Sequence, residues 1–69
     1  QRDVWVRMLI DAARRGGEFN LARALLAERV SEQPTSAPSW KIYGDVLERV
    51  GETTHAATAR ARATALLAA

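Results

Sequence analysis

Few residues in this chain have the types and spacing that catalysis requires. His55 is the only histidine, and the 69 residues include no cysteine. A metal ion at His55 would therefore need carboxylates as its other ligands, and a surface position near the start of a helix explains this residue better. Ser31, Ser36 and Ser39 lie in or beside a proline-containing turn, and no glycine elbow presents them as nucleophiles. We therefore predict no enzymatic activity, no metal site and no cofactor.

The basic residues offer a second kind of chemistry, the binding of anions. Nine of the ten are arginines, but the net charge is only +2. Acidic residues are interleaved with them through the first three helical segments, and no segment has the Asn, Gln and Arg cluster that reads bases. The segment from Thr53 onward is the exception, since it carries His55, Arg60 and Arg62 without an acidic residue. Anion or nucleic-acid binding through this segment is the alternative function, and nucleic acid is the less favoured partner.

Apolar residues recur at helical spacing in four segments, which predicts an all-α fold. The first segment ends at Gly16 and Gly17, because glycine readily adopts the left-handed conformation of a helix C-terminus. A turn with Pro34 and Pro38 separates the second segment from the third, and Pro38 suits the first turn of a helix. The expected buried residues are Val6, Leu9, Ile10 and Ala13 in the first segment and Ala22, Leu25, Leu26 and Val30 in the second.

The second half of the chain predicts a closely packed helix pair. The third helix carries large side chains on one stripe with a gap at Gly44, and Gly51 ends it. The fourth helix offers a face of alanines, so the two helices should approach most closely at Gly44. The two stripes are Trp40, Tyr43, Gly44 and Leu47 on the third helix and Ala56, Ala59 and Ala63 on the fourth.

The two halves of the sequence match each other at a period of 34 residues. The matches coincide with turn glycines and small packing residues, where packing restricts the choice of side chain. We therefore interpret the pattern as an internal repeat. The identities are Asp11 with Asp45, Arg15 with Arg49, Gly17 with Gly51, Glu18 with Glu52, Ala22 with Ala56 and Ala27 with Ala61.

This period and its residues resemble the tetratricopeptide repeat family, in which a Trp, Leu-Gly, Tyr series precedes Ala, an aromatic residue and Pro. Val6, Ile10 and Arg29 depart from that pattern in the first half. The resemblance implies two stacked antiparallel helix-turn-helix hairpins in a single domain, residues 1–69, with repeats at about 3–36 and 37–69. The matching residues are Leu9, Ala13, Gly17, Phe19, Ala22, Leu26 and Pro34 in the first half, and Trp40, Tyr43, Gly44, Leu47, Gly51, Ala56 and Ala63 in the second.

The resemblance also implies a function. Proteins similar to this one are scaffolds that bind an extended or helical segment of a protein partner in the concave surface made by the first helix of each repeat. Two charged pairs on these helices, Arg7 with Asp11 and Lys41 with Asp45, are four residues apart and can neutralise each other. A solvated, self-paired face is therefore an equal alternative. The groove residues carried over by position are Val4, Arg7, Asp11, Arg14, Lys41, Asp45 and Glu48.

Both ends of the chain raise the question of further contacts. Trp5 stands one residue off the first apolar stripe, and packing at the edge of the core is favoured over contact with a preceding element, subunit or partner. Leu66 and Leu67 leave an apolar end on the fourth helix, whereas a repeat array normally closes with a polar capping helix and needs about three repeats. We therefore expect either a fragment of a longer repeat protein or a homo-oligomer that covers Leu66 and Leu67.

Neither a membrane span nor a secretion signal is expected. No run approaches the roughly 18 apolar residues of a spanning helix, and no basic-then-apolar leader begins the chain. A soluble chain is the prediction, and without cysteines a bacterial cytoplasm and periplasm are both consistent with the sequence.

Overall fold

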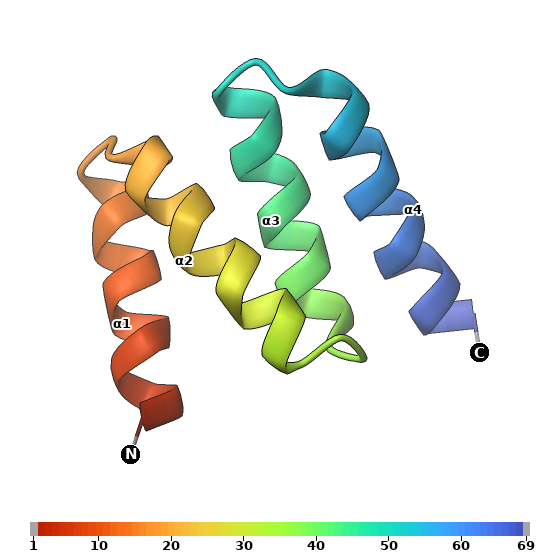
Figure 1. Ribbon diagram of the computed structural model, residues 1–69, viewed down its shortest axis with the longest axis horizontal. Coiled ribbons are helices and arrows are strands. Elements are labelled where there is room, and N and C mark those ends of the chain that lie inside the picture. Colours follow the sequence, from red (N-terminus) through yellow and green to blue (C-terminus); the bar gives the residue numbers. More distant parts are fainter. Residues whose placement is uncertain (1, 69) are drawn as a thin grey trace.

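The computed structural model describes residues 2–68, which contain four helices and no strand. The helices are α1 (Arg2–Arg15), α2 (Phe19–Glu32), α3 (Ala37–Arg49) and α4 (Thr53–Ala68). They lie side by side in chain order as two antiparallel hairpins, α1–α2 and α3–α4, which stack where α3 packs on α2 (Figure 1). The predicted all-α fold of two stacked hairpins is confirmed. Gln1 and Ala69, the outermost residues of the expected domain, lie outside the described residues.

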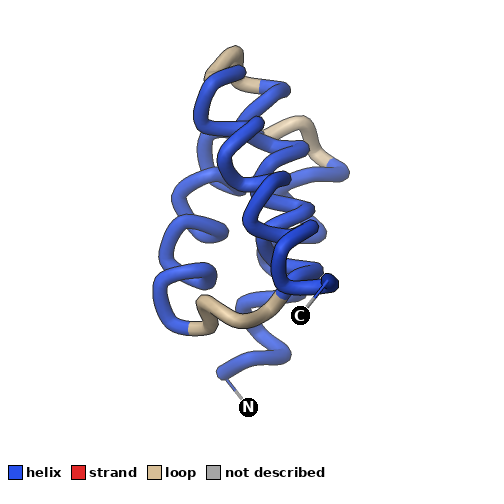
Figure 2. Tube along the Cα trace, turned by 90° about the vertical axis from the view of Figure 1, so that its right-hand side faces the viewer, coloured by secondary structure: helices blue, strands red, loops and turns tan. Residues whose placement is uncertain are grey.

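Both hairpins turn on a glycine, and the loops are confined to the ends of the helices (Figure 2). Gly17 and Gly51 have φ angles of +76° and +88°, in the left-handed region that glycine enters without steric cost. The N–H of Glu18 donates to the carbonyl of Ala13 at 2.8 Å, and the equivalent bond 34 residues further on measures 2.9 Å. The period read from the sequence is thus repeated in the backbone geometry of the two turns.

The loop between the hairpins ends in a well-defined helix start. Ser36 is the N-cap of α3, and its hydroxyl accepts a hydrogen bond from the N–H of Ser39 at 3.4 Å. Such a bond satisfies one of the backbone donors that have no partner within the helix. Pro38 lies in the first turn of α3, as the sequence predicts.

One core joins the first three helices. It contains Ile10 and Ala13 from α1, Ala22 and Leu26 from α2, and Val46 from α3. Leu26 is only 1% exposed, and burying a leucine side chain stabilises a fold by about 1.5–3 kcal/mol. Because α1 and α3 both pack on the side chains that α2 contributes to this core, the core fixes the positions of α1 and α3 relative to each other.

A second core lies between α3 and α4, which approach closely at Gly44 as predicted. A Cβ atom at Gly44 would stand 2.8 Å from Cγ of Arg60 and 3.3 Å from the carbonyl oxygen of Ala56. The rings of Trp40 and Tyr43, whose centroids are 6.1 Å apart, cover this core. Its fully buried members are Leu47, Ala56 and Ala59, and Ala63 is buried further along α4.

Two predictions for α1 are wrong. Leu9 was expected on the buried stripe, but 52% of its surface is exposed, and Trp5 is 64% exposed rather than packed at the edge of the core. The physical reason is the place of α1 at the end of the row of helices, where it packs mainly against α2 (Figure 1). The burial of Ile10 and Ala13 fixes the rotation of α1 and turns the face with Trp5 and Leu9 away from every described helix.

Candidate interaction groove

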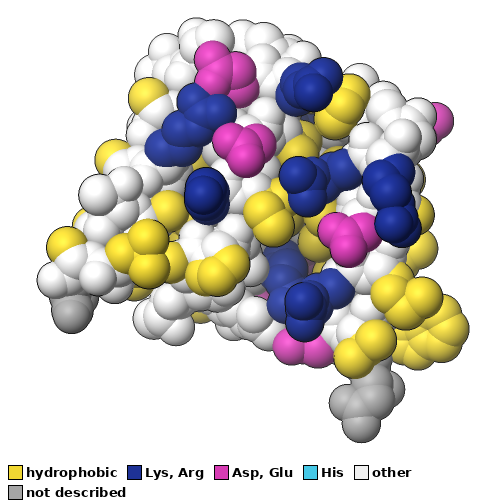
Figure 3. All heavy atoms as spheres, turned by 180° about the vertical axis from the view of Figure 1, so that it is seen from behind, with side chains coloured by type: hydrophobic (Ala, Val, Ile, Leu, Met, Phe, Trp, Pro, Cys, Tyr) yellow, Lys and Arg dark blue, Asp and Glu magenta, His cyan; other side chains and the backbone are white. Residues whose placement is uncertain are grey.

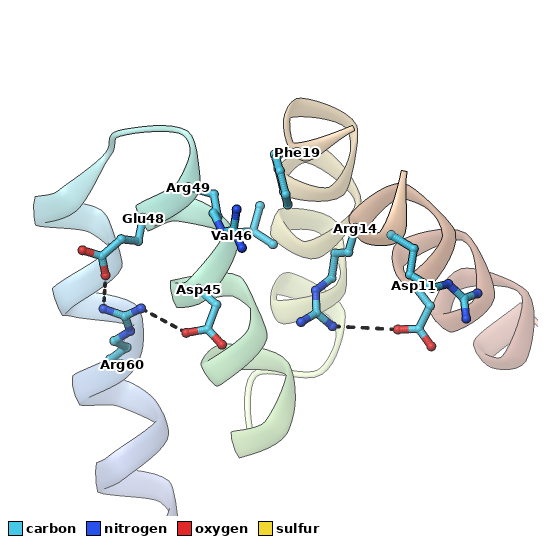
Figure 4. Close-up of a pocket in the computed structure, with 9 residues that line it drawn as sticks. Asp11, Arg14, Phe19, Asp45, Val46, Glu48, Arg49 and Arg60 are labelled. Atoms are coloured by element: carbon cyan, nitrogen blue, oxygen red, sulfur yellow. Dashed lines mark hydrogen bonds and ion pairs between the residues drawn. The ribbon is translucent and has the colours of Figure 1, made fainter. Parts of the chain in front are cut away.

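An open hollow of about 540 Å³ lies between α1 and α3 (Figure 4). Side chains from the first helix of each hairpin form its two sides, and the apolar residues Phe19 and Val46 lie between them. We call this hollow the α1–α3 groove. Its lining residues are Asp11, Arg14 and Arg15 from α1, Phe19 from α2, Asp45, Val46, Glu48 and Arg49 from α3, and Arg60 from α4.

Arg60 reaches from α4 to α3 and pairs with two acidic groups of the groove, which leaves one negative charge in excess there. Its guanidinium donates to the carboxylates of Asp45, at 3.0 Å, and of Glu48 (Figure 4). These hydrogen bonds, first to Asp45 and then to Glu48, raise the pKa of Arg60 above its ordinary value. Because the pKa is raised on folding, the stabilising effect is present below the unfolded pKa and is lost only in strongly alkaline solution. Arg60 therefore remains charged throughout the neutral range.

The charge pairs of the groove differ from those that sequence spacing alone allowed. Asp11 pairs with Arg14 at 3.9 Å and not with Arg7. Asp45 likewise pairs with Arg60 of the neighbouring helix and not with Lys41. The reason for the second difference is the close approach of α4, which brings a guanidinium to a carboxylate from across the helix interface.

Two arginines of the groove have no acidic partner. Among residues 2–68, no carboxylate lies within ion-pair distance of Arg15 or Arg49. The guanidinium carbon of Arg49 lies 5.1 Å from the ring centre of Phe19, in the geometry of a cation–π contact. The groove thus combines the aromatic ring of Phe19 with two guanidinium groups, those of Arg15 and Arg49, that no carboxylate of residues 2–68 contacts.

A second hollow of about 330 Å³ continues from the first at Asp11, which lines both. Its walls come from α1, α2 and the start of α3. Arg29 crosses this region, where its Nε donates to the hydroxyl of Ser39 at 3.3 Å. The remaining lining residues are Arg7, Ile10, Leu26, Ser36, Pro38 and Ile42.

The structure places most of the expected groove residues along these two hollows. Four of them line the α1–α3 groove, and Arg7 lines the second hollow. Val4 and Lys41 are exposed on their helices but line neither hollow. Sequence reasoning missed the contributions of Arg15, Phe19, Val46, Arg49 and Arg60 to this groove. The repeat contained a signal for one pair, since Arg15 and Arg49 occupy equivalent positions in the two halves.

The fourth helix presents less free charge and less apolar surface than expected. Arg60 is engaged by α3, and Nδ1 of His55 lies 3.4 Å from a carboxylate oxygen of Glu52. Leu66 is half-buried, whereas Leu67 is 77% exposed. Of the sequence features that suggested a contact surface on α4, Arg62 and Leu67 are exposed and have no partner within residues 2–68, whereas His55 and Arg60 are exposed but lie beside carboxylates.

Two further kinds of site are absent from the described part of the chain. No group of three or more His, Cys, Asp or Glu side chains gathers within residues 2–68 in a way that could hold a metal ion. Within the same range, none of the helices has the length and apolar character needed to cross a membrane.

Comparisons with known proteins found no matching family model, no matching curated protein and no matching solved structure. The resemblance to tetratricopeptide repeats therefore depends on the residues of this chain alone, and the function must be argued from the geometry of the groove.

Proposed function

We propose that this chain is a protein-interaction module of the tetratricopeptide kind that binds a segment of a partner protein in the α1–α3 groove. The observation that carries the proposal is the composition of this groove. It joins four residues expected at the binding face with an aromatic surface and two arginines that have no acidic partner among residues 2–68. A purely solvated, self-paired face would leave no such unmatched charge.

The chemistry of the groove favours a partner segment that carries both acidic and apolar side chains. Asp11 pairs with Arg14, and Asp45 and Glu48 share Arg60. With Arg15 and Arg49, the four arginines and three acidic residues of the lining leave one net positive charge, and Arg15 and Arg49 are the guanidinium groups that remain unpaired among residues 2–68 and available to a ligand. A carboxylate of the partner can form charge-assisted hydrogen bonds with these guanidinium groups. An apolar side chain next to it would cover the ring of Phe19, which is half-buried in the free chain.

This proposal is tested by titrating isotope-labelled protein with short peptides of defined composition, one of glutamate and leucine, one of lysine and leucine, and one of serine and glycine. We expect the glutamate–leucine peptide to shift the amide signals of 11–19 and 45–49. Arg49→Gln should weaken its binding about tenfold, because it removes a charge-assisted hydrogen bond.

Arg62→Gln is the matched control, since Arg62 is an exposed arginine of α4 that does not line the groove. Binding that is equally sensitive to Arg62→Gln and Arg49→Gln would show a general attraction to positive charge. Peptide-induced shifts confined to α4 would contradict the groove as the binding site.

The alternative is anion or nucleic-acid binding through α4. It is the weaker proposal, because the ion pairs of Arg60 with Asp45 and Glu48 leave Arg62 as the arginine of that helix without an acidic partner among residues 2–68. Binding of a nucleic-acid backbone requires several basic contacts and falls steeply with added salt. A titration with single-stranded and double-stranded oligonucleotides at low and high salt would reveal it.

A further inference from the structure

The outward side of α1 carries an apolar surface that no described helix covers. Trp5, Met8, Leu9 and Ala12 recur at intervals of three, one and three residues, which places them on one face of the helix. Trp5, Met8 and Leu9 are each more than half exposed. We call these four residues the α1 outer stripe. Figure 3 shows hydrophobic side chains gathered at the end of the molecule beside the N-terminus, where this stripe begins.

The internal repeat relates the α1 outer stripe to a face of α3 that is packed against another helix. A shift of 34 residues places Met8 on Ile42, Leu9 on Tyr43 and Ala12 on Val46. These three residues of α3 belong to, or pack against, the core that α3 forms with α2. The α1 outer stripe is therefore the counterpart of a face that the second hairpin buries against another helix.

The fourth helix of a second copy would be a poor cover for this stripe. The repeat places Arg60 of α4 at the position of Leu26 in α2, and Asp45 and Glu48 hold that arginine. Much of the remaining surface of α4 is alanine, which buries little apolar area on contact. The apolar surface of matching size on the described chain is the α1 outer stripe itself.

We infer that two copies of this chain associate through their α1 outer stripes, related by a twofold axis. Such an interface is isologous, so each stripe meets its own copy. Complete burial of the exposed parts of Trp5, Met8 and Leu9, with the neighbouring exposed Val4, would remove at most on the order of 1,000 Å² in total from water, which is about the minimum expected of a specific interface. The α1–α3 groove faces elsewhere and remains open in this dimer.

Sedimentation of the intact chain over a range of concentrations tests the inference. We expect a reversible monomer–dimer equilibrium that survives high salt, because apolar contacts are not screened. The double substitution Trp5→Gln and Leu9→Gln should raise the dissociation constant about 30-fold, since tryptophans at the centre of an interface commonly contribute this much. Glutamine keeps helix propensity close to that of leucine, and circular dichroism verifies that the variant is folded.

Leu67→Gln is the matched control, because it removes the most exposed leucine of the chain, and that residue lies on α4. The inference predicts no change in dimerisation for this variant. A chain that stays monomeric at every concentration, or a dimer that Leu67→Gln disrupts and Trp5→Gln with Leu9→Gln does not, would overturn it.

Disulfide cross-linking tests the twofold geometry. Because the chain contains no cysteine, an introduced cysteine is its only thiol. Met8→Cys places a single thiol near the middle of the stripe, and Leu67→Cys places one on α4. Under mild oxidation, Met8→Cys should form a disulfide-linked dimer faster than Leu67→Cys, because a disulfide requires Cα atoms within about 7 Å of each other. Equal rates for the two variants would contradict an interface centred on α1.

Discussion

Gly17 and Gly51 show how strongly a single position can be restricted by its backbone. Each glycine ends the first helix of a hairpin at positive φ, and a Cβ atom at either position would meet nothing within 4 Å. Space is therefore not the constraint at these positions. The constraint is conformational, because an L-residue in the left-handed region experiences a close contact between its own Cβ and the following carbonyl.

We predict that Gly17→Ala and Gly51→Ala each destabilise the fold by about 1 kcal/mol, by nearly the same amount, because the two turns have the same geometry. Chemical denaturation of the two variants checks this. Asparagine tolerates the left-handed conformation better than alanine, so Gly17→Asn should be milder than Gly17→Ala. Unequal losses at the two glycines would show that the turns are not equivalent in solution.

Arginines in this chain differ in the partner that each side chain contacts. Arg14 pairs along its own helix, Arg60 pairs across a helix interface, and Arg49 lies over the ring of Phe19. All of these side chains are at least partly exposed to solvent, so each contact contributes little to stability. Their importance lies in deciding which charges of the groove remain available to a ligand.

At the scale of the helices, the interface between α3 and α4 depends on the absence of a side chain at Gly44. The helices meet there with Arg60 Cγ and the Ala56 carbonyl close to the glycine. This contact also carries Arg60 to the carboxylates of α3. The packing of the second hairpin and the charge of the α1–α3 groove are thus set by the same small residue.

Gly44→Val should destabilise the fold by about 2 kcal/mol, because the added carbons must displace α4 and overpacking of this kind commonly costs 1–3 kcal/mol. Thermal or chemical denaturation measures the loss. Ala61→Val, at an exposed position of the same helix pair, is the control and should change stability by about 0.5 kcal/mol. A Gly44→Val variant as stable as this control would show that the helices do not approach closely in solution.

At the scale of the whole molecule, two surfaces with different chemistry face different directions. The α1–α3 groove is charged and lined by both hairpins, and the α1 outer stripe is apolar and belongs to one end helix. A dimer through the stripe would present two grooves at once. Two linked sites can bind a multivalent partner far more tightly than either site alone, provided that the partner reaches both.

A chain of this length buries only about 60% of the surface that its unfolded state exposes, so its stability is expected to be modest. Dimerisation adds stability that depends on concentration. We therefore predict that the midpoint of thermal unfolding rises with protein concentration, and that Trp5→Gln with Leu9→Gln removes this dependence. A midpoint that is constant for the unmodified chain would argue against the dimer, while leaving the proposed function of the groove intact.

The sequence by itself determined the four helices, their turns and most of the core. Helical spacing identified Ile10, Ala13, Leu26 and Leu47 as buried, and all four are. Glycine and proline fixed the ends of the helices because their effects on the backbone are local. The close approach at Gly44 was also predictable, since large side chains on one helix faced alanines on the other.

Only the tertiary structure decided which apolar and charged side chains have partners. Periodicity placed Leu9 among the buried residues, but whether a helix covers that face depends on which helices lie beside α1. Spacing likewise allowed Asp45 to pair with Lys41 along its own helix, whereas Arg60 reaches it from α4. Both outcomes depend on contacts between segments that are distant in sequence, and a local sequence pattern does not indicate which distant segments will meet.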